Sequence, residues 1–370
     1  MSATIPPSAA RAVGCCYRDG MELVELTPAA ARATSTALHL GVVDVARACA
    51  IEDLGTDDIA WTATDLARFL MPTPDAAKAL WAGVENGRIV GFATIEAPLT
   101  DNLQLAEINV LVAPGSRRRG IGGRLFEIAQ QRAAALGRRI WLSWAQTTPP
   151  NGQSATISAP PGGELLAEHP GVQFLLHHGF ALEQIDRISR LDRPVPLDSQ
   201  APRAELLPSG YELKTWPTPL PPEWIDSYAR LRSRVTIDAP LAGVDAEEEA
   251  WSPKRLTRRW AAQAVVGQRE LVVAAVDVAS GTPVAFTQMF WSDENPEIAE
   301  QGFTFVRADH RGHHLGLLVK QAMLGELAKR APTISRIYTF NASENDHMLA
   351  INAQLGYQLC ALGGTFQKKT

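Results

Sequence analysis

A run of three arginines followed by glycines is the strongest chemical signal in the sequence. It lies between a segment with strand-like alternation and a segment with helical periodicity. Glycines allow a close approach of the backbone to a ligand, and the first amides of a helix have no partner inside the helix. The helix dipole and the arginine charges act in the same sense, so the run predicts a site for an anionic group such as a diphosphate. The run consists of Arg117, Arg118, Arg119, Gly120, Ile121, Gly122 and Gly123.

Two other interpretations of this run are open at the level of sequence. Gly120 and Gly122 begin a Gly-x-Gly-x-x-Gly pattern, which is typical of dinucleotide-binding folds, but Leu125 replaces the third glycine. The run also fits a solvent-exposed basic turn that only caps a surface helix. A repeat of the surrounding elements favours a binding loop over both alternatives.

The segments around the run alternate between strand and helix patterns. Asn86-Gly87 is a favoured hairpin turn, and it separates two short apolar segments that are predicted as strands, at 79–84 and 89–96. Residues 105–112 alternate in polarity, as a strand with one buried face does. A helix is predicted over 120–136. The basic run therefore lies at a turn from strand to helix.

The same order of elements is predicted again in the C-terminal half. Strands at 270–276, 283–291 and 302–306 precede a helix over 315–327. The turn before this helix is again basic and contains glycine, with the sequence His310, Arg311, Gly312, His313, His314, Leu315 and Gly316. The repeat predicts an α/β (α+β) chain of two domains, each with a mixed sheet covered by helices.

A proline-rich segment, with Pro194, Pro196, Pro202 and Pro208, separates the two halves. Prolines between two well-patterned segments are typical of a linker. We therefore expect a flexible tail over 1–19, an N-terminal domain over 20–193, a linker over 194–209 and a C-terminal domain over 210–370.

The Arg-x-x-Gly-x-Gly pattern at Arg117, Gly120 and Gly122 resembles the acetyl-CoA signature of the Gcn5-related N-acetyltransferases, the GNAT superfamily. The resemblance extends over nearly the whole chain, because Gly179-Phe180 and Gly356-Tyr357 close the two halves as Gly-Phe/Tyr does in that family. The double copy resembles the tandem acetyltransferases common in actinobacteria. This implies two tandem domains, each with a mixed, mostly antiparallel twisted sheet flanked by helices.

The resemblance also implies a co-substrate and the residues that bind it. The co-substrate is acetyl-CoA or another acyl-CoA, and no metal is involved. Its pantetheine arm pairs with the backbone of Leu111 and Val112, and its diphosphate lies on residues 117–123. In the second half, the implied cofactor-binding residues are Arg311, Gly312, His313, Leu315, Gly316, Asn341 and Asn345.

The resemblance implies a base as well, because an amine must lose a proton before it can accept an acyl group. Glu107 stands ten residues before Arg117, at the position of the catalytic glutamate in the histone-acetylating branch of the family. A glutamate with a raised pKa suits base chemistry near neutral pH. A purely structural or exposed glutamate is the alternative. The family's usual acid, a tyrosine four residues before the glycine of Gly-Phe/Tyr, is replaced by Leu175 and Asn352.

The two halves are not equivalent in sequence. His314 replaces the first glycine of the signature in the second half, and by residue count Gln301 stands where Glu107 does. We therefore favour the first half as the catalytic one. Asn345 is also well suited to cap a helix and Asn341 to satisfy a strand end, so both asparagines have a structural alternative.

The composition fits a folded protein of 370 residues with 46% hydrophobic residues and a net charge of -5. The negative charge argues against general binding to nucleic acids or membrane surfaces. The four cysteines have no zinc-type spacing, and the N-terminus lacks the apolar segment of a signal peptide, so we expect a cytoplasmic protein.

The resulting hypothesis is an enzyme, an acyl-CoA-dependent N-acyltransferase that transfers acetyl to a primary amine of a small molecule by direct attack. The same fold with a longer acyl-CoA or an aminoacyl-tRNA as donor, and a non-catalytic CoA-binding module, are the alternatives. tRNA would then be the only nucleic-acid partner. The chain would be a monomer that forms a pseudo-dimer, or a homodimer.

Overall fold

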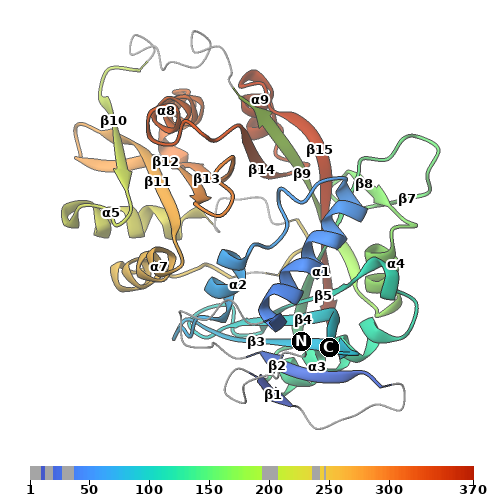
Figure 1. Cartoon of the computed structure of the whole chain (residues 1–370). Coiled ribbons are helices and arrows are strands. Elements are labelled where there is room, and N and C mark those ends of the chain that lie inside the picture. The colour runs from blue at the N-terminus through green and yellow to red at the C-terminus, as the bar shows by residue number, and fades with distance from the viewer. Residues whose placement is uncertain (1–9, 13–19, 27–36, 194–206, 236–241, 246) are drawn as a thin grey trace. The chain divides into compact units, whose positions relative to one another are not determined.

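The computed structural model describes residues 10–12, 20–26, 37–193, 207–235, 242–245 and 247–370 (Figure 1). Most of the predicted tail and linker, and both Cys15 and Cys16, lie outside these residues. The chain divides into two compact units. Unit 1 comprises Met1–Ile157, Leu165–Glu183 and Gly364–Thr370, and unit 2 comprises Ser158–Glu164 and Gln184–Gly363.

Unit 1 is built on a sheet that is antiparallel except at one pair of strands. Its successive neighbours are β1 (Ala10–Ala12), β2 (Glu22–Leu26), β3 (Ala76–Glu85), β4 (Arg88–Pro98), β5 (Leu105–Val112) and β6 (Ile140–Thr147). The pair β5–β6 is parallel. The first residues of β9 (Ala181–Asp192) and the last residues of β15 (Gln358–Lys369) also belong to this unit.

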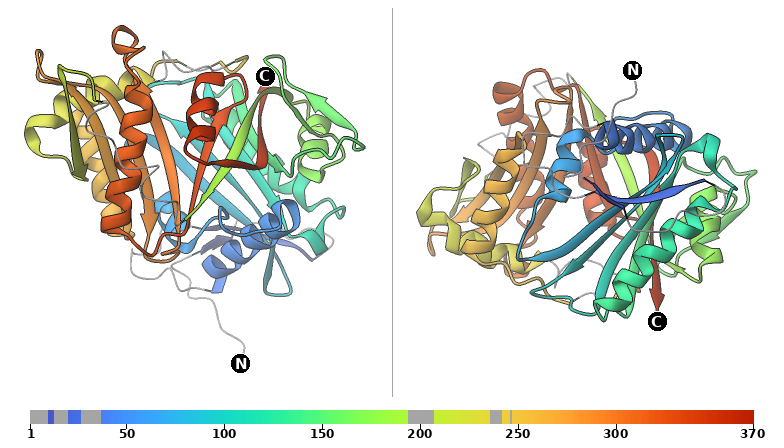
Figure 2. Two further views of the ribbon diagram at one scale, coloured as in Figure 1. Left: turned by 90° about the horizontal axis from the view of Figure 1, so that it is seen from above. Right: turned by 60° about the horizontal axis from the view of Figure 1, so that its bottom comes forward.

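Helices cover both faces of the sheet in unit 1. One face packs against α1 (Ala37–Leu54) and α2 (Ala63–Leu70), with a core that includes Leu80, Ala82 and Phe92. The other face packs against α3 (Ile121–Ala135), which crosses β3, β4 and β5 in the right-hand view of Figure 2. Between β6 and β9 lie β7 (Thr156–Ser158), β8 (Glu164–Leu166) and α4 (Pro170–His177).

Unit 2 repeats this architecture. Its strands, in spatial order, are β10 (Tyr211–Pro217), β11 (Gln268–Asp277), β12 (Thr282–Ser292), β13 (Ile298–Val306), β14 (Arg336–Ala342) and the larger part of β9. The pair β13–β14 is the parallel one. The helices are α5 (Pro222–Ser233), α7 (Pro253–Val265), α8 (Leu315–Arg330) and α9 (Asp346–Gln354).

The two faces of the unit 2 sheet can be read from its alternating strand residues. Val273 and Ala275 of β11 pack in the core under α8, whereas the intervening Val272 and Ala274 pack in the core under α5 and α7. This alternation is the expected property of a strand that is buried on both sides.

The predicted fold class is confirmed, since both units contain a mixed, mostly antiparallel sheet flanked by helices. The sequence patterns did not predict α1, which is apolar around most of its surface and so lacks a one-sided stripe. Within the described part of the chain, no helix is long and apolar enough to cross a membrane.

Gly91 allows β4 and β5 to lie close together at the start of the site. A Cβ atom at this position would lie 2.8 Å from the carbonyl oxygen of Leu111, which is backbone and therefore hard to displace. We predict that Gly91→Ala lowers the free energy of unfolding by about 1–3 kcal/mol because of this overpacking. Urea unfolding followed by circular dichroism measures the effect. Gly115→Ala is the control, because a Cβ there meets nothing within 4 Å. Equal loss in the two variants would contradict the packing argument.

Candidate functional site

Strands β5 and β6 separate after a short parallel pairing, and this creates a fork in unit 1. Pairing with β6 covers only Leu105 to Glu107, whereas β5 continues to Val112. Because the amide of Ala113 donates to Val90 on β4, alternation directs the backbone groups of Leu111 toward β4 as well. The backbone groups of Val110 and Val112 point to the other side, into the fork. The expectation for Leu111 therefore needs correction: Val110, not Leu111, offers its backbone beside Val112.

The side chain of Asn109 lies at the point where the fork opens. Its Oδ1 accepts a hydrogen bond of 3.1 Å from the amide of Trp144 on β6, and its Nδ2 donates to Oε1 of Glu107 at 2.8 Å. The amide of Trp144 can only donate, so the orientation of the Asn109 side chain is fixed. Asn109 thus joins the two strands where their ladder ends and orients Glu107. No sequence motif indicates this role, although Asn109 lies two residues from Glu107 on the same strand face.

Glu107 is accessible to solvent and yet electrostatically perturbed. Surrounding protein atoms desolvate its carboxyl and raise its pKa above the ordinary value, while the hydrogen bond from Asn109 lowers it and the charge of Glu96 raises it further. Glu96 lies directly opposite Glu107 on β4 and forms an ion pair of 3.5 Å with Lys78. A carboxylate that combines access with a raised pKa has the properties of a general base.

The basic run forms the turn that the sequence predicted. A short 3₁₀ turn over Pro114–Ser116 leads to Arg118 and Gly120, both in the left-handed region with φ of 62° and 79°. Helix α3 begins at Ile121 and has no acidic residue in its first turn, so the positive end of its dipole is not neutralised there. Gly122 permits close packing, because a Cβ on it would lie 3.1 Å from the ring of Phe174.

The three arginines have separate positions. Arg118 donates to Gln173 at 2.8 Å, and Arg119 forms an ion pair with Glu85 at 2.9 Å, both at exposed sites. Arg117 instead points inward and is only 20% exposed. Its direction indicates that it holds the loop in place, whereas Arg118 and Arg119 are accessible to a ligand.

A polar cluster around Asp53 fixes this loop to the neighbouring helices. Asp53 on α1 accepts from Arg117 at 3.3 Å and lies 3.1 Å from Nε2 of His169. The Nδ1 atom of His169 accepts from the amide of Gly171, so Nε2 carries the ring proton that faces Asp53. The cluster therefore connects α1, the loop and the start of α4.

The carbonyl of Val112, where β5 ends, accepts two side-chain hydrogen bonds. The Arg117 Nε donates to it at 3.2 Å and the Cys49 thiol at 3.3 Å. Burial raises the pKa of the Cys49 thiol, and the hydrogen bond to Arg117 opposes that shift. The thiol therefore stays protonated at neutral pH and acts as a donor.

In unit 1, neither Leu175 nor His178 takes the place of the missing tyrosine acid. Leu175 at that position is buried in the apolar interior. The ring of His178 packs against Phe126 and Phe174, at centroid distances of 4.6 and 4.4 Å. Burial, with the nearby His177 and Lys368, lowers the pKa of His178, so it is neutral at neutral pH and is a poor proton source.

Unit 2 contains a second fork and a second turn. The pairing of β13 with β14 ends at Gln301, and β13 continues to Val306. The turn places Gly312 and His314 in the left-handed region, with φ of 84° and 57°. In unit 1 the two left-handed residues are Arg118 and Gly120. The glycine is therefore the second of the two left-handed residues in unit 1 and the first of the two in unit 2. A Cβ at Gly120 meets nothing within 4 Å, which indicates that a side chain at this position, as in His314, projects into open space.

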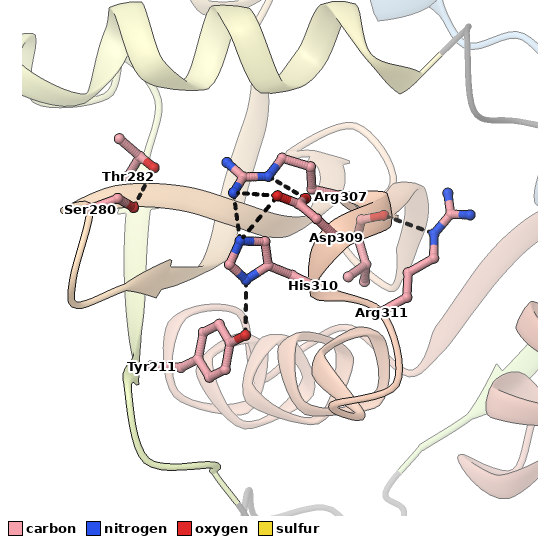
Figure 3. Close-up of polar contacts among 8 residues, drawn as sticks. Tyr211, Ser280, Thr282, Arg307, Asp309, His310 and Arg311 are labelled. Atoms are coloured by element: carbon pink, nitrogen blue, oxygen red, sulfur yellow. Dashed lines mark hydrogen bonds and ion pairs between the residues drawn. The ribbon is translucent and has the colours of Figure 1, made fainter.

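A network around His310 supports the second turn (Figure 3). Arg307 makes a two-point contact with Asp309, at 2.6 and 3.0 Å, and also donates to Nε2 of His310. Arginine only donates, so Nδ1 carries the His310 proton and donates to the hydroxyl of Tyr211 at 2.9 Å. Arg311 donates from Nε to the carbonyl of Val306, which repeats the contact of Arg117 with Val112.

Residue counting misplaced the unit 2 counterpart of Glu107. The ladder between β12 and β13 shifts register between Thr287 and Met289, and Phe290 pairs with Glu300. Phe290 corresponds to Glu96, so Glu300 and not Gln301 lies at the position of Glu107. Gln301 is buried between Thr287 and the hydroxyl of Tyr357, to which it is hydrogen-bonded. A β-bulge adds one residue, and the sequence pattern gave no sign of it.

The two asparagines predicted in unit 2 have different environments. Asn345 caps α9, because its side chain accepts from the amide of Met348 at 3.2 Å. Asn341 lies on β14 beyond the last residue paired with β13 and accepts from Asn352 at 2.6 Å. Among the described residues, no group of three His, Cys, Asp or Glu is arranged to hold a metal ion.

The fork, the glycine turn and the helix start occur in both units, so the α/β fold is duplicated. The model of the acetyltransferase (GNAT) family matches residues 49–155. The match covers the part of unit 1 that contains the fork and the turn, and the chain has the same fold as a solved tandem GNAT protein. Acetyltransferases of this family use acetyl-CoA as co-substrate in general, which supports an acyltransferase activity.

Two solved structures illustrate the similarity. A tandem GNAT protein from the clavulanic acid biosynthesis pathway, solved without AcCoA, is 26% identical, with 94% of this chain and 98% of that chain covered and a TM-score of 0.70. A GCN5-related N-acetyltransferase from Sphaerobacter thermophilus is 14% identical, with 94% and 95% covered and a TM-score of 0.61, which shows the fold alone. No curated protein matches the sequence.

The Asp53 cluster yields a prediction for stability. We expect Asp53→Asn to lower the free energy of unfolding by about 1–2 kcal/mol, because the partly buried Arg117 loses its charged partner. Glu52→Gln, an exposed neighbour on the same helix, is expected to change it by less than about 0.5 kcal/mol. Thermal and urea unfolding of both variants measure the difference, and similar stabilities for the two variants would refute the role of the cluster.

Proposed function

We propose that this protein is an acyl-CoA-dependent N-acyltransferase that transfers acetyl from acetyl-CoA to a primary amine of a small molecule, with unit 1 as the catalytic unit. The observation that carries this proposal is the position of Glu107. A perturbed, accessible carboxylate lies at the opening of a strand fork, and β5 leads from this fork to an uncompensated helix start.

The acyl donor, acetyl-CoA, would occupy both the fork and the turn. Its pantetheine amides are matched by the backbone groups of Val110 and by the amide of Val112, and its diphosphate by the first amides of α3 around Gly120 and Gly122. Arg118 and Arg119 are accessible for charge-assisted contacts with the phosphates. The corresponding residues of the second turn, from Arg311 to Gly316, would form a second donor loop.

The acceptor would approach from the face covered by α1 and α2. Glu107 lies on this face, next to Glu96 and Lys78 in one cross-strand row. The rings of Trp61, Phe69 and Phe92 pack on the same side. The two carboxylates would attract an ammonium group to this face.

The reaction would be a direct transfer. Glu107 takes a proton from the ammonium group, and the neutral nitrogen attacks the thioester carbonyl, so that a C–N bond forms and the C–S bond breaks. A backbone amide in the fork, such as that of Val110, would stabilise the negative charge on the carbonyl oxygen. The CoA leaves as a thiolate, and the second proton of the nitrogen passes through solvent to this thiolate, so that the products are the amide and the CoA thiol.

The role of Glu107 predicts a pH profile. The base must be ionised, so kcat/KM should rise with pH and level off above a pKa that is higher than the ordinary glutamate value. We expect Glu107→Gln to lower kcat by about 10²- to 10⁴-fold and to abolish this rise. Steady-state kinetics between pH 5 and 9, with release of CoA thiol as the readout, measure both effects.

Glu96→Gln is the matched control for this experiment. It removes the negative charge that raises the pKa of Glu107 and leaves Lys78 nearby, so the rise should move to lower pH with little loss of rate at high pH. Unchanged turnover in Glu107→Gln would remove Glu107 from the mechanism.

If the turn at Gly120 binds the diphosphate, two glycine substitutions with the same cost in stability should differ in their effect on acetyl-CoA affinity. Gly120 and Gly137 both have φ near 75°, at 79° and 70°, and both face open space. Alanine at either position should therefore cost about 1 kcal/mol of stability. Only Gly120→Ala is expected to weaken acetyl-CoA binding, by about tenfold, because it distorts the amides at the start of α3. Titration calorimetry with acetyl-CoA measures this, and equal affinities for the two variants would argue against a diphosphate site at Gly120.

A panel of donors and amines distinguishes the remaining alternatives. Turnover with a longer acyl-CoA but not with acetyl-CoA would keep the reaction class and change the donor. Salt-sensitive binding of aminoacyl-tRNA would indicate a tRNA donor. Tight CoA binding without turnover for any amine would favour a non-catalytic module.

A further inference from the structure

Two buried charges of opposite sign lie on the face of the unit 2 sheet that α5 and α7 cover. Arg232 of α5 is 5% exposed, and the side chain of Glu270, near the start of β11, is 1% exposed. The guanidinium of Arg232 makes no hydrogen bond or ion pair with any residue that the structure describes. Among these same residues, Oε2 of Glu270 has no hydrogen-bond partner either. Burial of a charged group without a partner is unfavourable, so each of the two needs an explanation.

The surroundings of Arg232 hold its guanidinium in place without supplying hydrogen-bond acceptors. The ring centres of Phe303 and Trp251 lie 4.3 and 4.9 Å from its central carbon. Aromatic rings pack on the faces of a guanidinium and leave the N–H groups at its edge free to donate. Burial lowers the pKa of Arg232, but an arginine stays charged near neutral pH. Its fork of N–H donors is therefore matched to a carboxylate.

The carboxylate of Glu270 is held at one oxygen and open at the other. Its Oε1 accepts from Nε2 of Gln288 at 2.6 Å, which fixes the orientation of the group. Its Oε2 lies 4.0 Å from Nε of Arg259, which is too far for a hydrogen bond. The hydroxyl of Tyr228 lies close to this carboxylate, because burial raises its pKa most and the charge of Glu270 raises it further. The open oxygen can accept from a donor such as an ammonium group.

Arg232 and Glu270 do not neutralise each other, although they belong to one cluster. Each charge acts on the other, yet they form no ion pair. Direct pairing would offset much of the cost of burying both. Lys78 occupies the position of Glu270 in the corresponding cross-strand row of unit 1, so the fold does not require a carboxylate at this point. Two separated charges of opposite sign are complementary to a ligand that carries both.

We propose that this face of unit 2 binds a small amino carboxylate, whose carboxylate group pairs with Arg232 and whose ammonium group pairs with Glu270. Phe303 is 48% exposed and the side chain of Arg259 is 35% exposed, so the cluster reaches the protein surface at these two residues. A ligand with a single charge would leave either Arg232 or Glu270 without a partner. The site binds its ligand without a covalent step, and it does not depend on the acyl transfer proposed for unit 1.

The test measures binding to the full chain by titration calorimetry. The probes are linear amino carboxylates from glycine to 6-aminohexanoate, because this series covers a range of separations between the two ligand charges. Each probe is compared with the alkylamine and the alkyl carboxylate of equal chain length. We expect one amino carboxylate of the series to bind at least about tenfold more tightly than either of its single-charge controls.

Two variants separate the two ends of the site. Arg232→Met removes the partner of the carboxylate and keeps a side chain that packs on the rings, and Glu270→Gln removes the partner of the ammonium group and keeps the shape. Each should lower the affinity for the amino carboxylate by about tenfold. In Arg232→Met this ligand should bind no better than the alkylamine, and in Glu270→Gln no better than the alkyl carboxylate. General damage to the fold would not produce this crossed pattern.

Arg255→Gln is the matched control. Arg255 packs on the same Trp251 ring, at 4.5 Å, but it is partly exposed and already donates to the carbonyl of Ala250 at 3.0 Å. Its replacement should change the affinity by less than about twofold. Hydrogen exchange of the wild-type chain keeps the test decisive if the variants fold poorly. The bound amino carboxylate should slow amide exchange in α5 and α7.

Three outcomes would overturn the proposal. They are a series in which no amino carboxylate exceeds its single-charge controls, affinities that stay equal in the wild-type chain and both variants, and slowed exchange only outside α5 and α7. In each of these cases Glu107-dependent turnover would leave the proposed function intact. Conversely, a lack of CoA release with every amine would not change the outcome of this binding test.

Discussion

The end of one strand ladder is the constraint on which the rest of the site depends. A backbone N–H or C=O in a folded protein needs a hydrogen-bond partner, and a strand that loses its neighbour leaves such groups open. In unit 1 this happens after Glu107, where β6 diverges and β5 continues with β4 on one side only. The backbone groups of Val110 and the amide of Val112 are a template for any extended ligand with its own amides. The site is thus a consequence of where two strands separate.

Side chains set the extent of this opening. Asn109 connects the strands at the inner end, and Arg117 and Cys49 both donate to the carbonyl of Val112 at the outer end. Arg117 is in turn held by Asp53, so the position of the turn is fixed by α1 as well as by β5. Such support explains how a turn with two residues in the left-handed region keeps the first amides of α3 in one place.

The sequence predicted those parts of the site that depend on local rules. Gly120 has a positive φ, and a positive φ is what a glycine at a turn indicates. Alternation placed Glu107 on a strand, although its role as a base remains a prediction. The contacts that the sequence patterns did not indicate depend on partners distant in sequence. Arg117 is directed inward by Asp53, 64 residues away, and a bulge in β13 substitutes Glu300 for Gln301. Neither a partner on another helix nor an added residue in a ladder leaves a periodic signal.

The comparison of the two units shows how one fold can distribute polarity in opposite ways. In unit 1 the interior under α3 is apolar at Phe126 and Leu175, and the perturbed carboxylate lies on the other face, at Glu107. In unit 2 the interior under α8 contains Lys320 and Asn352. Lys320 is held there by neutral partners, the amide of Asn352 and, at 5.4 Å, the ring of Tyr357, rather than by a carboxylate. The two sheets share one topology, and the side chains that face each core decide how polar its interior is.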